Sequence, residues 1–369
     1  MCIEFTRDRP SHAGGRRVRA RNNPRPTWGT AAADLYHFFS RGGDGRQVGC
    51  SQVAAVVDLR DLPTPIVQAG MGAVARHELA AAVSEAGGLG TIGGARAPIA
   101  EELAAARRLT GRPIAVNLVL PLLRPGDVQA AADAEVIVTF WGKPRRLAGG
   151  TWVHQCGSVE EARAAEAAGA DAVMAQGVEA GGHVRGTTPV LELVERVRAA
   201  VKVPVLAAGG IVDRSGVGQA LDAGAVAAVS GTRFLLSEES RAHPDYKRRC
   251  LEADSTVLTE LFGLGWADAP HRVIPNVATR RWLGEDPRGP RWIRLVNRLA
   301  SPVVLRVPEG LQDRGLAIQR PSLPFLGPPM ALDDGPRSLL DSGPLYAGAN
   351  VTRISDIRPA GQIVHNLTP

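Results

Sequence analysis

The sequence is poor in the features that mark several specialised classes of protein. Aromatic residues make up only 4% of the 369 residues, and no stretch approaches the ~18 consecutive apolar residues that a membrane-spanning helix needs. The four cysteines are far apart and form no CxxC pair, which argues against a zinc site and a disulfide framework. The sequence therefore predicts no metal, no membrane partner and a reducing, cytoplasmic location.

Basic charge is concentrated at the N-terminus. The formal net charge is +6, and the first 25 residues hold seven arginines against two acids. The rest of the chain is therefore close to neutral, and we expect no nucleic-acid partner. We interpret residues 1–60 as a disordered or loosely attached leader, in which residues 31–40 are compatible with a short helix. An Arg-rich, acid-poor leader also has the composition of an organelle transit peptide.

From residue 61 onwards, short apolar runs alternate with amphipathic segments. The apolar runs are continuous rather than alternating, as expected for parallel strands that are buried on both faces. Most of them stop at a glycine or a polar residue. The eight predicted strands are 65–68, 89–92, 113–118, 136–140, 152–155, 171–174, 203–207 and 225–229, and the clearest predicted helices are 76–86, 99–109, 159–168, 189–200 and 215–223.

Eight strand–helix units in succession favour a closed (β/α)8 barrel over an open doubly wound sheet. An open sheet of the dinucleotide-binding type would carry GxGxxG after its first strand, but here Ala75 replaces the third glycine. We assign the barrel to residues 61–234. Residues 235–369 are predicted to form a helical cap or subdomain whose tail packs back on the barrel, with helices near 245–252, 258–262 and 292–299.

One unit of the predicted barrel is incomplete. Residues 141–150, between the fourth and fifth strands, are too few for an ordinary helix and carry little helical pattern. We therefore expect the fourth helix to be almost lost. Without it, part of strands four and five would be exposed along an outer groove.

The chemistry-bearing residues follow the predicted strands. In a (β/α)8 barrel the active site lies at the carboxyl ends of the strands, so these residues are expected to meet in one pocket. His183 is the only histidine of these strand-end loops, and imidazole exchanges protons near neutral pH. A loop histidine bonded to backbone groups is the equal alternative. The candidate residues are Gly70, Met71, Asn117, the loop from Gln176 to His183, Gly209, Gly210, Gly231 and Thr232.

The glycines after strands seven and eight stand where barrels commonly bind phosphate, because glycine lets an anion approach backbone N–H groups. The alternative is that these glycines form ordinary strand–helix turns. Their presence after two consecutive strands disfavours that alternative. Asn117 and Gln176 suit either a hydrogen bond to a polar ring or a helix cap. Glu179 is expected to fix its loop rather than act as a base. Cys156 is expected to be a buried structural residue, although residues 154–156 end a strand and could line the pocket.

The loop AQGVEAGGH at residues 175–183 resembles the signature loop of the nitronate monooxygenase family, formerly called 2-nitropropane dioxygenases. Residues 65–71, 207–211 and 230–234 are similar to further motifs of that family, in the same order. Residues 346–348 and 356–360 are similar to its C-terminal end. The resemblance covers roughly residues 62–270 and 343–365 and implies a TIM barrel that binds FMN non-covalently, without a metal.

The resemblance also implies roles for single residues. Asn117 and Gln176 would hydrogen-bond the flavin, Met71 would pack at its ring, and His183 would be the catalytic base or would orient the substrate. The implied reaction is the oxidation of an alkyl nitronate by O2 to a carbonyl compound and nitrite. The cofactor-binding residues that the resemblance implies are Gly70, Met71, Asn117, Gln176, Gly181, Gly209, Gly210, Ser230, Gly231 and Thr232. Of these, Gly209, Gly210, Gly231 and Thr232 would bind the phosphate.

Other functions remain open at this point. The FMN-dependent enoyl-acyl-carrier-protein reductases have a similar fold and loop and use NAD(P)H to reduce a double bond, and related flavin hydroxylases share the motifs. A flavin-binding barrel that is inactive because of its shortened segment is a third alternative. The expected partners are a small organic substrate and O2, with NAD(P)H added in the reductase alternative, and a homodimer is compatible with the sequence.

Overall fold

The computed structural model describes residues 56–304, 306–307, 311, 315 and 318–369. The predicted leader lies almost wholly outside the described residues, as does the short helix at 31–40. The chain divides into two compact units, Met1–Ser51 and Gln52–Pro369. The second unit contains every described residue and is considered by itself.

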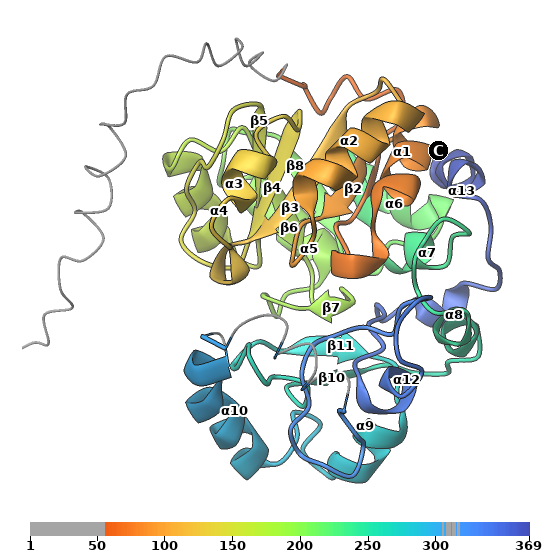
Figure 1. The fold of residues 1–369 in the computed structure, drawn as a ribbon. Coiled ribbons are helices and arrows are strands. Elements are labelled where there is room, and N and C mark those ends of the chain that lie inside the picture. Colours follow the sequence, from red (N-terminus) through yellow and green to blue (C-terminus); the bar gives the residue numbers. More distant parts are fainter. Residues whose placement is uncertain (1–55, 305, 308–310, 312–314, 316–317) are drawn as a thin grey trace, which may run out of the picture. The chain divides into compact units, whose positions relative to one another are not determined.

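Eight parallel strands form a closed barrel (Figure 1). The sheet runs β1-β9-β8-β6-β5-β4-β3-β2, and it closes because the N–H of Gln68 donates to the carbonyl of Leu89 at 2.9 Å. The predicted barrel is confirmed, and the open-sheet alternative is wrong. The strands are β1 (Ile66–Gln68), β2 (Gly90–Gly93), β3 (Ile114–Val119), β4 (Val136–Phe140), β5 (Thr151–Cys156), β6 (Ala172–Gln176), β8 (Val205–Ala208) and β9 (Ala227–Ser230).

Amphipathic helices cover the outside of the barrel. In α5, for example, Leu193, Val194 and Val197 are buried while the glutamates and arginines between them face solvent. Local signals fix where helices begin: the Ser158 hydroxyl accepts the N–H of Glu161 at the start of α4. The helices are α1 (His77–Glu85), α2 (Ile99–Leu109), the short α3 (Asp127–Ala130), α4 (Val159–Ala167), α5 (Val190–Arg198), α6 (Arg214–Asp222) and α7 (Thr232–Leu235).

Residues 141–150 form no helix, as predicted. The expected exposure of strands four and five is wrong, however, because β4 is fully buried and β5 nearly so. Leu147 and Ala148 pack against the core beside Ile137. The guanidinium of Arg146 lies 5.6 Å from the centre of the Trp152 ring and pairs with Asp171 at 2.8 Å. A cation–π contact and the side chains of Leu147 and Ala148 thus cover the surface that a helix would otherwise cover.

The C-terminal segment adds a second, smaller sheet. Strands β10 (Val257–Thr259), β11 (His271–Val273) and β7 (Gly182–His183) pair antiparallel in that order. The helix predicted near 258–262 is wrong, because β10 pairs with β11 up to Thr259 and the chain then turns at residues 261–262. The helices here are α8 (Pro244–Leu251), α9 (Val277–Trp282), α10 (Arg291–Val304), α12 (Leu339–Ser342) and α13 (Ala360–Leu367), of which α13 returns to pack on α1 (Figure 1).

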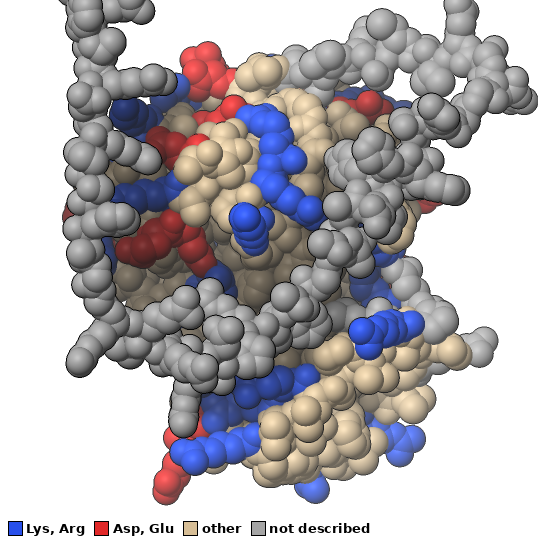
Figure 2. All heavy atoms as spheres, turned by 90° about the vertical axis from the view of Figure 1, so that its left-hand side faces the viewer, with Lys and Arg blue, Asp and Glu red and all other residues tan. Residues whose placement is uncertain are grey.

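Helix α10 has an unusual surface. It extends the helix predicted at 292–299 and leaves Trp292, Leu295, Leu299 and Val303 exposed. Figure 2 shows an uncharged surface between basic side chains on this lower part of the molecule. Across the described ranges, no helix has both the length and the apolarity that crossing a bilayer requires.

Candidate active site

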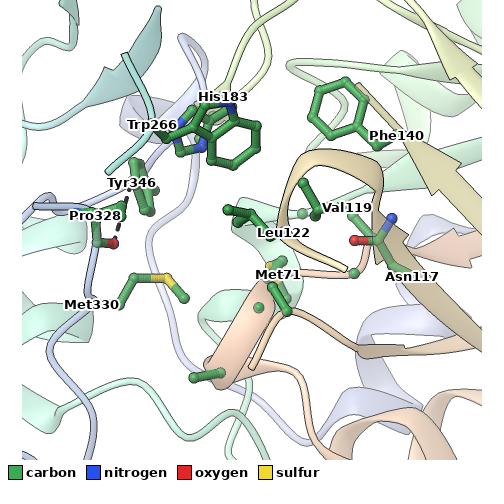
Figure 3. Close-up of a pocket in the computed structure, with 18 of the residues that line it drawn as sticks. Met71, Asn117, Val119, Leu122, Phe140, His183, Trp266, Pro328, Met330 and Tyr346 are labelled. Carbon is green, nitrogen blue, oxygen red and sulfur yellow. Dashed lines mark hydrogen bonds between the residues drawn. The ribbon is translucent and has the colours of Figure 1, made fainter. Parts of the chain in front are cut away.

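A cavity of about 1100 Å³ lies at the carboxyl ends of the barrel strands. Its far wall comes from the C-terminal segment: Figure 3 shows Met71, Asn117, Val119, Leu122 and Phe140 from the barrel, with Trp266, Pro328, Met330 and Tyr346 across from them. The structure brings nearly all predicted site residues to this one cavity. Its lining includes Gly70, Met71, Asn117, Gln176, Gly181, His183, Gly209, Gly210, Gly231 and Thr232, but not Ser230.

His183 is held at the cavity by β7. Its backbone pairs with His271 of β11, and the side chain of Gln176 fixes the same segment from the barrel. The Gln176 amide donates to the carbonyl of His183 at 2.9 Å and accepts the N–H of Arg185 at 3.0 Å. Gln176 is therefore a positioning residue for His183, and the helix-cap alternative does not apply to it.

The imidazole of His183 is packed among aromatic rings. It stacks on Trp266 with ring centroids 3.9 Å apart, and its buried Nε2 has no hydrogen-bond partner among the residues that the structure describes. Burial, aided by the nearby His271, holds the pKa of His183 well below its usual value of 6.5. The ring is therefore neutral at pH 7 at the wall of the cavity.

Asn117 and the first strand end shape the floor of the cavity. The Asn117 amide, buried in the middle of β3, donates to the carbonyl of Val138 at 3.3 Å, so it caps no helix. Gly70 lies so close that a Cβ there would come within 2.4 Å of the Asn117 Cβ. Only glycine fits at this strand end, which keeps the Asn117 amide open to the cavity (Figure 3).

The glycines after β8 and β9 form a second part of the wall. Gly209 and Gly210 have φ values of +121° and +68°, conformations that favour glycine. The C-terminal tail fastens both loops: the Asn350 amide donates to the Gly210 carbonyl at 2.7 Å, and the N–H of Gly348 donates to the Thr232 hydroxyl at 2.9 Å. The Ser230 hydroxyl donates to the Ile211 carbonyl at 2.7 Å, and Ser230 does not line the cavity.

Three other residues that the sequence raised have structural roles. The Glu179 carboxylate accepts the N–H of Val190 at 3.0 Å, which confirms that it fixes its loop. Burial raises the pKa of the Cys156 thiol to about 12, so it is a buried structural residue, as predicted. Burial lowers the pKa of His154 to about 4. Of residues 154–156 only Gln155 lines the cavity, because alternate side chains of a strand point to opposite faces.

Sequence reasoning missed several residues of the site. Trp266 and Trp141 form an aromatic group with His183, with 5.3 Å between the two indole rings. Trp141 has a φ of +62°, which is rare for a bulky side chain. Arg76 lines the cavity, and its buried Nη1 has no hydrogen-bond partner within the described part of the chain. No sequence motif marks these residues.

Comparison with known proteins identifies the class to which this barrel belongs, that of the flavin-dependent oxidoreductases. The chain belongs to the nitronate monooxygenase family, whose model matches residues 54–155 and 143–369. The two matched segments overlap at residues 143–155, which include most of the stretch that lacks its helix and strand β5 after it.

Individual relatives agree with this assignment. A nitronate monooxygenase of Paraburkholderia phytofirmans is 30% identical over 64% of this chain and 80% of its own length. A (3aS,4S,5R,7aS)-5-hydroxy-7a-methyl-1-oxo-octahydro-1H-indene-4-carboxyl-CoA dehydrogenase of Mycobacterium tuberculosis is 36% identical over 59% of this chain. The chain spans 65% of the length of that dehydrogenase and of its Rhodococcus jostii counterpart.

Solved structures show the same fold. FabK from Thermotoga maritima superimposes with a TM-score of 0.66 at 30% identity, covering 84% of this chain and 93% of that one. The nitroalkane oxidase of Streptomyces ansochromogenes superimposes with a TM-score of 0.64 at 32% identity, covering 84% of this chain and 96% of that one.

Proposed function

We propose that this protein is an FMN-dependent enzyme that oxidises an anionic alkyl nitronate with O2 to a carbonyl compound and nitrite. The observation that carries the proposal is a neutral His183, whose Nε2 has no partner among the described residues, at a cavity that two glycine-rich strand ends also line. Family membership supports a flavin, and the P. phytofirmans relative supports the nitronate.

The residues present fit FMN. Binding cavities for small molecules typically measure ~300–1,000 Å³, so a cavity of about 1100 Å³ has room for a flavin and an organic substrate together. Gly209, Gly210, Gly231 and Thr232 would hold the phosphate, because they leave no large side chain between backbone and cavity. Asn117 supplies an amide, and Met71, Val119 and Leu122 supply apolar surface for the ring system.

When bound, FMN supplies electron transfer, and the chain's own residues select and orient the substrate. Neutral His183 offers Nε2 as a hydrogen-bond partner or proton acceptor, and Gln176 keeps that nitrogen in place. Arg76 places positive charge at the cavity wall, and Arg96 and Arg124 line the same side. This charge favours an anion over the neutral nitroalkane.

A reductase that uses NAD(P)H is the second candidate. The M. tuberculosis relative is named a dehydrogenase of a carboxyl-CoA compound, and the cavity is larger than a small nitronate requires. Binding of NAD(P)H, a homodimer and a cytoplasmic location stay predictions from the sequence.

The test of the proposal begins with the purified protein. We expect it to carry a yellow flavin that heat releases as FMN, and to release nitrite from propyl 2-nitronate in air at a rate that depends on O2. A colourless preparation that takes up no FMN would contradict the cofactor. A fully loaded preparation without nitrite release would contradict the reaction and favour the inactive barrel or the reductase.

A further inference from the structure

Helix α10 exposes a line of large apolar side chains. Trp292, Leu295, Leu299 and Val303 are 50%, 53%, 69% and 62% exposed, and their spacing of three to four residues puts them on one side of the helix. The opposite side packs inward through Ile293, Asn297 and Ser301. We call these four residues the α10 stripe. Contiguous apolar surface of this kind usually marks an interaction site.

A small basic cavity lies beside the α10 stripe. It measures about 250 Å³ and shares Leu295 with the stripe. Its other lining residues are Glu260 and four arginines: Arg288, Arg291, Arg294 and Arg298. We call it the arginine cavity. Since arginines outnumber acids four to one in its lining, it suits an anion such as a phosphate group.

The ion pairs of the arginine cavity leave one guanidinium for a ligand. Arg288 pairs with Glu260 at 2.5 Å, and Arg294 and Arg298 pair with Asp286 and Asp268 on the rim. Arg291 makes no ion pair with any residue that the structure describes, and it directly precedes Trp292 of the stripe.

We propose that α10 docks on a bilayer containing anionic phospholipids, with the stripe at the acyl boundary and a lipid phosphate in the arginine cavity. Apolar side chains that include tryptophan, flanked by arginine on the same helix, are the composition of helices that lie in a membrane interface. Figure 2 shows this arrangement as an uncharged surface bordered by basic side chains. The proposal replaces the expectation of no membrane partner and is independent of the proposed reaction.

The charges favour a bilayer over a second copy of the chain. Among the described residues of α9 and α10, three arginines lack an ion pair: Arg280, Arg281 and Arg291. From residue 260 to residue 304 the structure describes only one acid without an ion pair, Glu285. A symmetric contact through the stripe would bring these arginines of two copies together, whereas lipid phosphates neutralise them.

Docking in this way would also bring the large cavity close to lipid. Val304, the last residue of α10, lines that cavity, and so does Phe325, which is 54% exposed. An apolar compound dissolved in the membrane would then have a short path to the site.

The test is co-sedimentation of the full-length protein with vesicles. We expect it to bind vesicles of phosphatidylcholine and phosphatidylglycerol, and to bind at least tenfold less to phosphatidylcholine alone. The double variant Leu295→Asp/Leu299→Asp should lose binding at least tenfold, and Arg291→Ala several-fold on the anionic vesicles only. Leu109→Asp is the matched control, because Leu109 is 56% exposed on α2, and it should bind as the wild type does.

Three results would overturn the proposal. The first is equal binding by the wild type and the double variant at unchanged circular dichroism and melting temperature. The second is that the wild type forms a dimer in sedimentation velocity and binds no vesicles, while the double variant is monomeric. That result would assign the stripe to a contact with a second copy of the chain. The third is a melting temperature raised by inorganic phosphate and unchanged by anionic vesicles, which would assign the arginine cavity to a free anion.

Discussion

The imidazole of His183 lies nearly flat on the indole of Trp266, with 3.9 Å between ring centroids and 19° between ring planes. His183 stands in the loop that follows barrel strand β6, whereas Trp266 belongs to the C-terminal segment. The stack shields one face of the imidazole from water, and burial of this kind is the main cause of its lowered pKa. The protonation state of the site therefore depends on both parts of the chain.

Replacing Trp266 should change the pH dependence of the enzyme. In the wild type burial holds the pKa of His183 well below 6.5, so we expect kcat/KM to depend little on this group as the pH falls from 8 through 6.5. In Trp266→Ala the imidazole gains water, its pKa rises toward 6.5, and kcat/KM should fall as the pH drops through that value. Steady-state rates across this range measure the effect. Trp292→Ala, on the α10 surface, should keep the flat profile, and a flat profile in Trp266→Ala would contradict the role of the stack.

His183→Ala should retain the flavin and lose turnover by ~10²–10⁴, the range expected when a positioned proton-transfer group is removed. Flavin absorbance per protein gives the occupancy, and nitrite release gives the rate. His365→Ala is the matched control, because His365 is exposed on α13. Wild-type kinetics in His183→Ala would remove this residue from the mechanism.

Gly210→Val should lose FMN. At Gly210 φ is +68°, and a Cβ would lie 2.9 Å from the Glu179 Cβ and 3.0 Å from the Asn350 amide nitrogen. The side chain therefore has to displace the loop that we assign to the phosphate. Equilibrium dialysis against FMN measures the loss. Gly218→Ala, where a Cβ meets nothing within 4 Å, should bind normally, and full occupancy in Gly210→Val would exclude the phosphate cradle.

Arg146→Ala should destabilise the barrel by about 1 kcal/mol. It removes the cation–π contact with Trp152 and a half-exposed ion pair with Asp171, each worth up to ~1 kcal/mol. Urea unfolding measures the change. Arg145→Ala is the control, because Arg145 is exposed and forms no ion pair with the described residues. Equal stability of the two variants would show that Arg146 does not replace the missing helix.

The barrel was predictable because its signals are local. Each strand is a short apolar run that ends at glycine or a polar residue, and predicted and observed strands agree within about two residues. Helix α2 has the predicted bounds, Ile99–Leu109. Such elements depend on neighbours in the sequence, so the sequence alone locates them.

The aromatic surroundings of His183 were not predictable in this way. Strand β7 has two residues and exists because β11, ninety residues away in sequence, pairs with it. Pairing of β10 with β11 likewise replaces the start of the helix predicted near 258–262. The sequence likewise shows no reason why Trp141 and Trp266 should meet. Contacts between segments that are far apart in the sequence create these features, and a single sequence does not show which segments make contact.

The central claim is tested most directly by flavin absorbance in an anaerobic stopped-flow experiment, in which the FMN-loaded protein is mixed with propyl 2-nitronate or with NADPH. The account predicts a rapid change with the nitronate, which air then reverses with release of nitrite, and only a slow change with NADPH. Rapid bleaching by NADPH with no response to the nitronate would contradict it and establish the reductase instead.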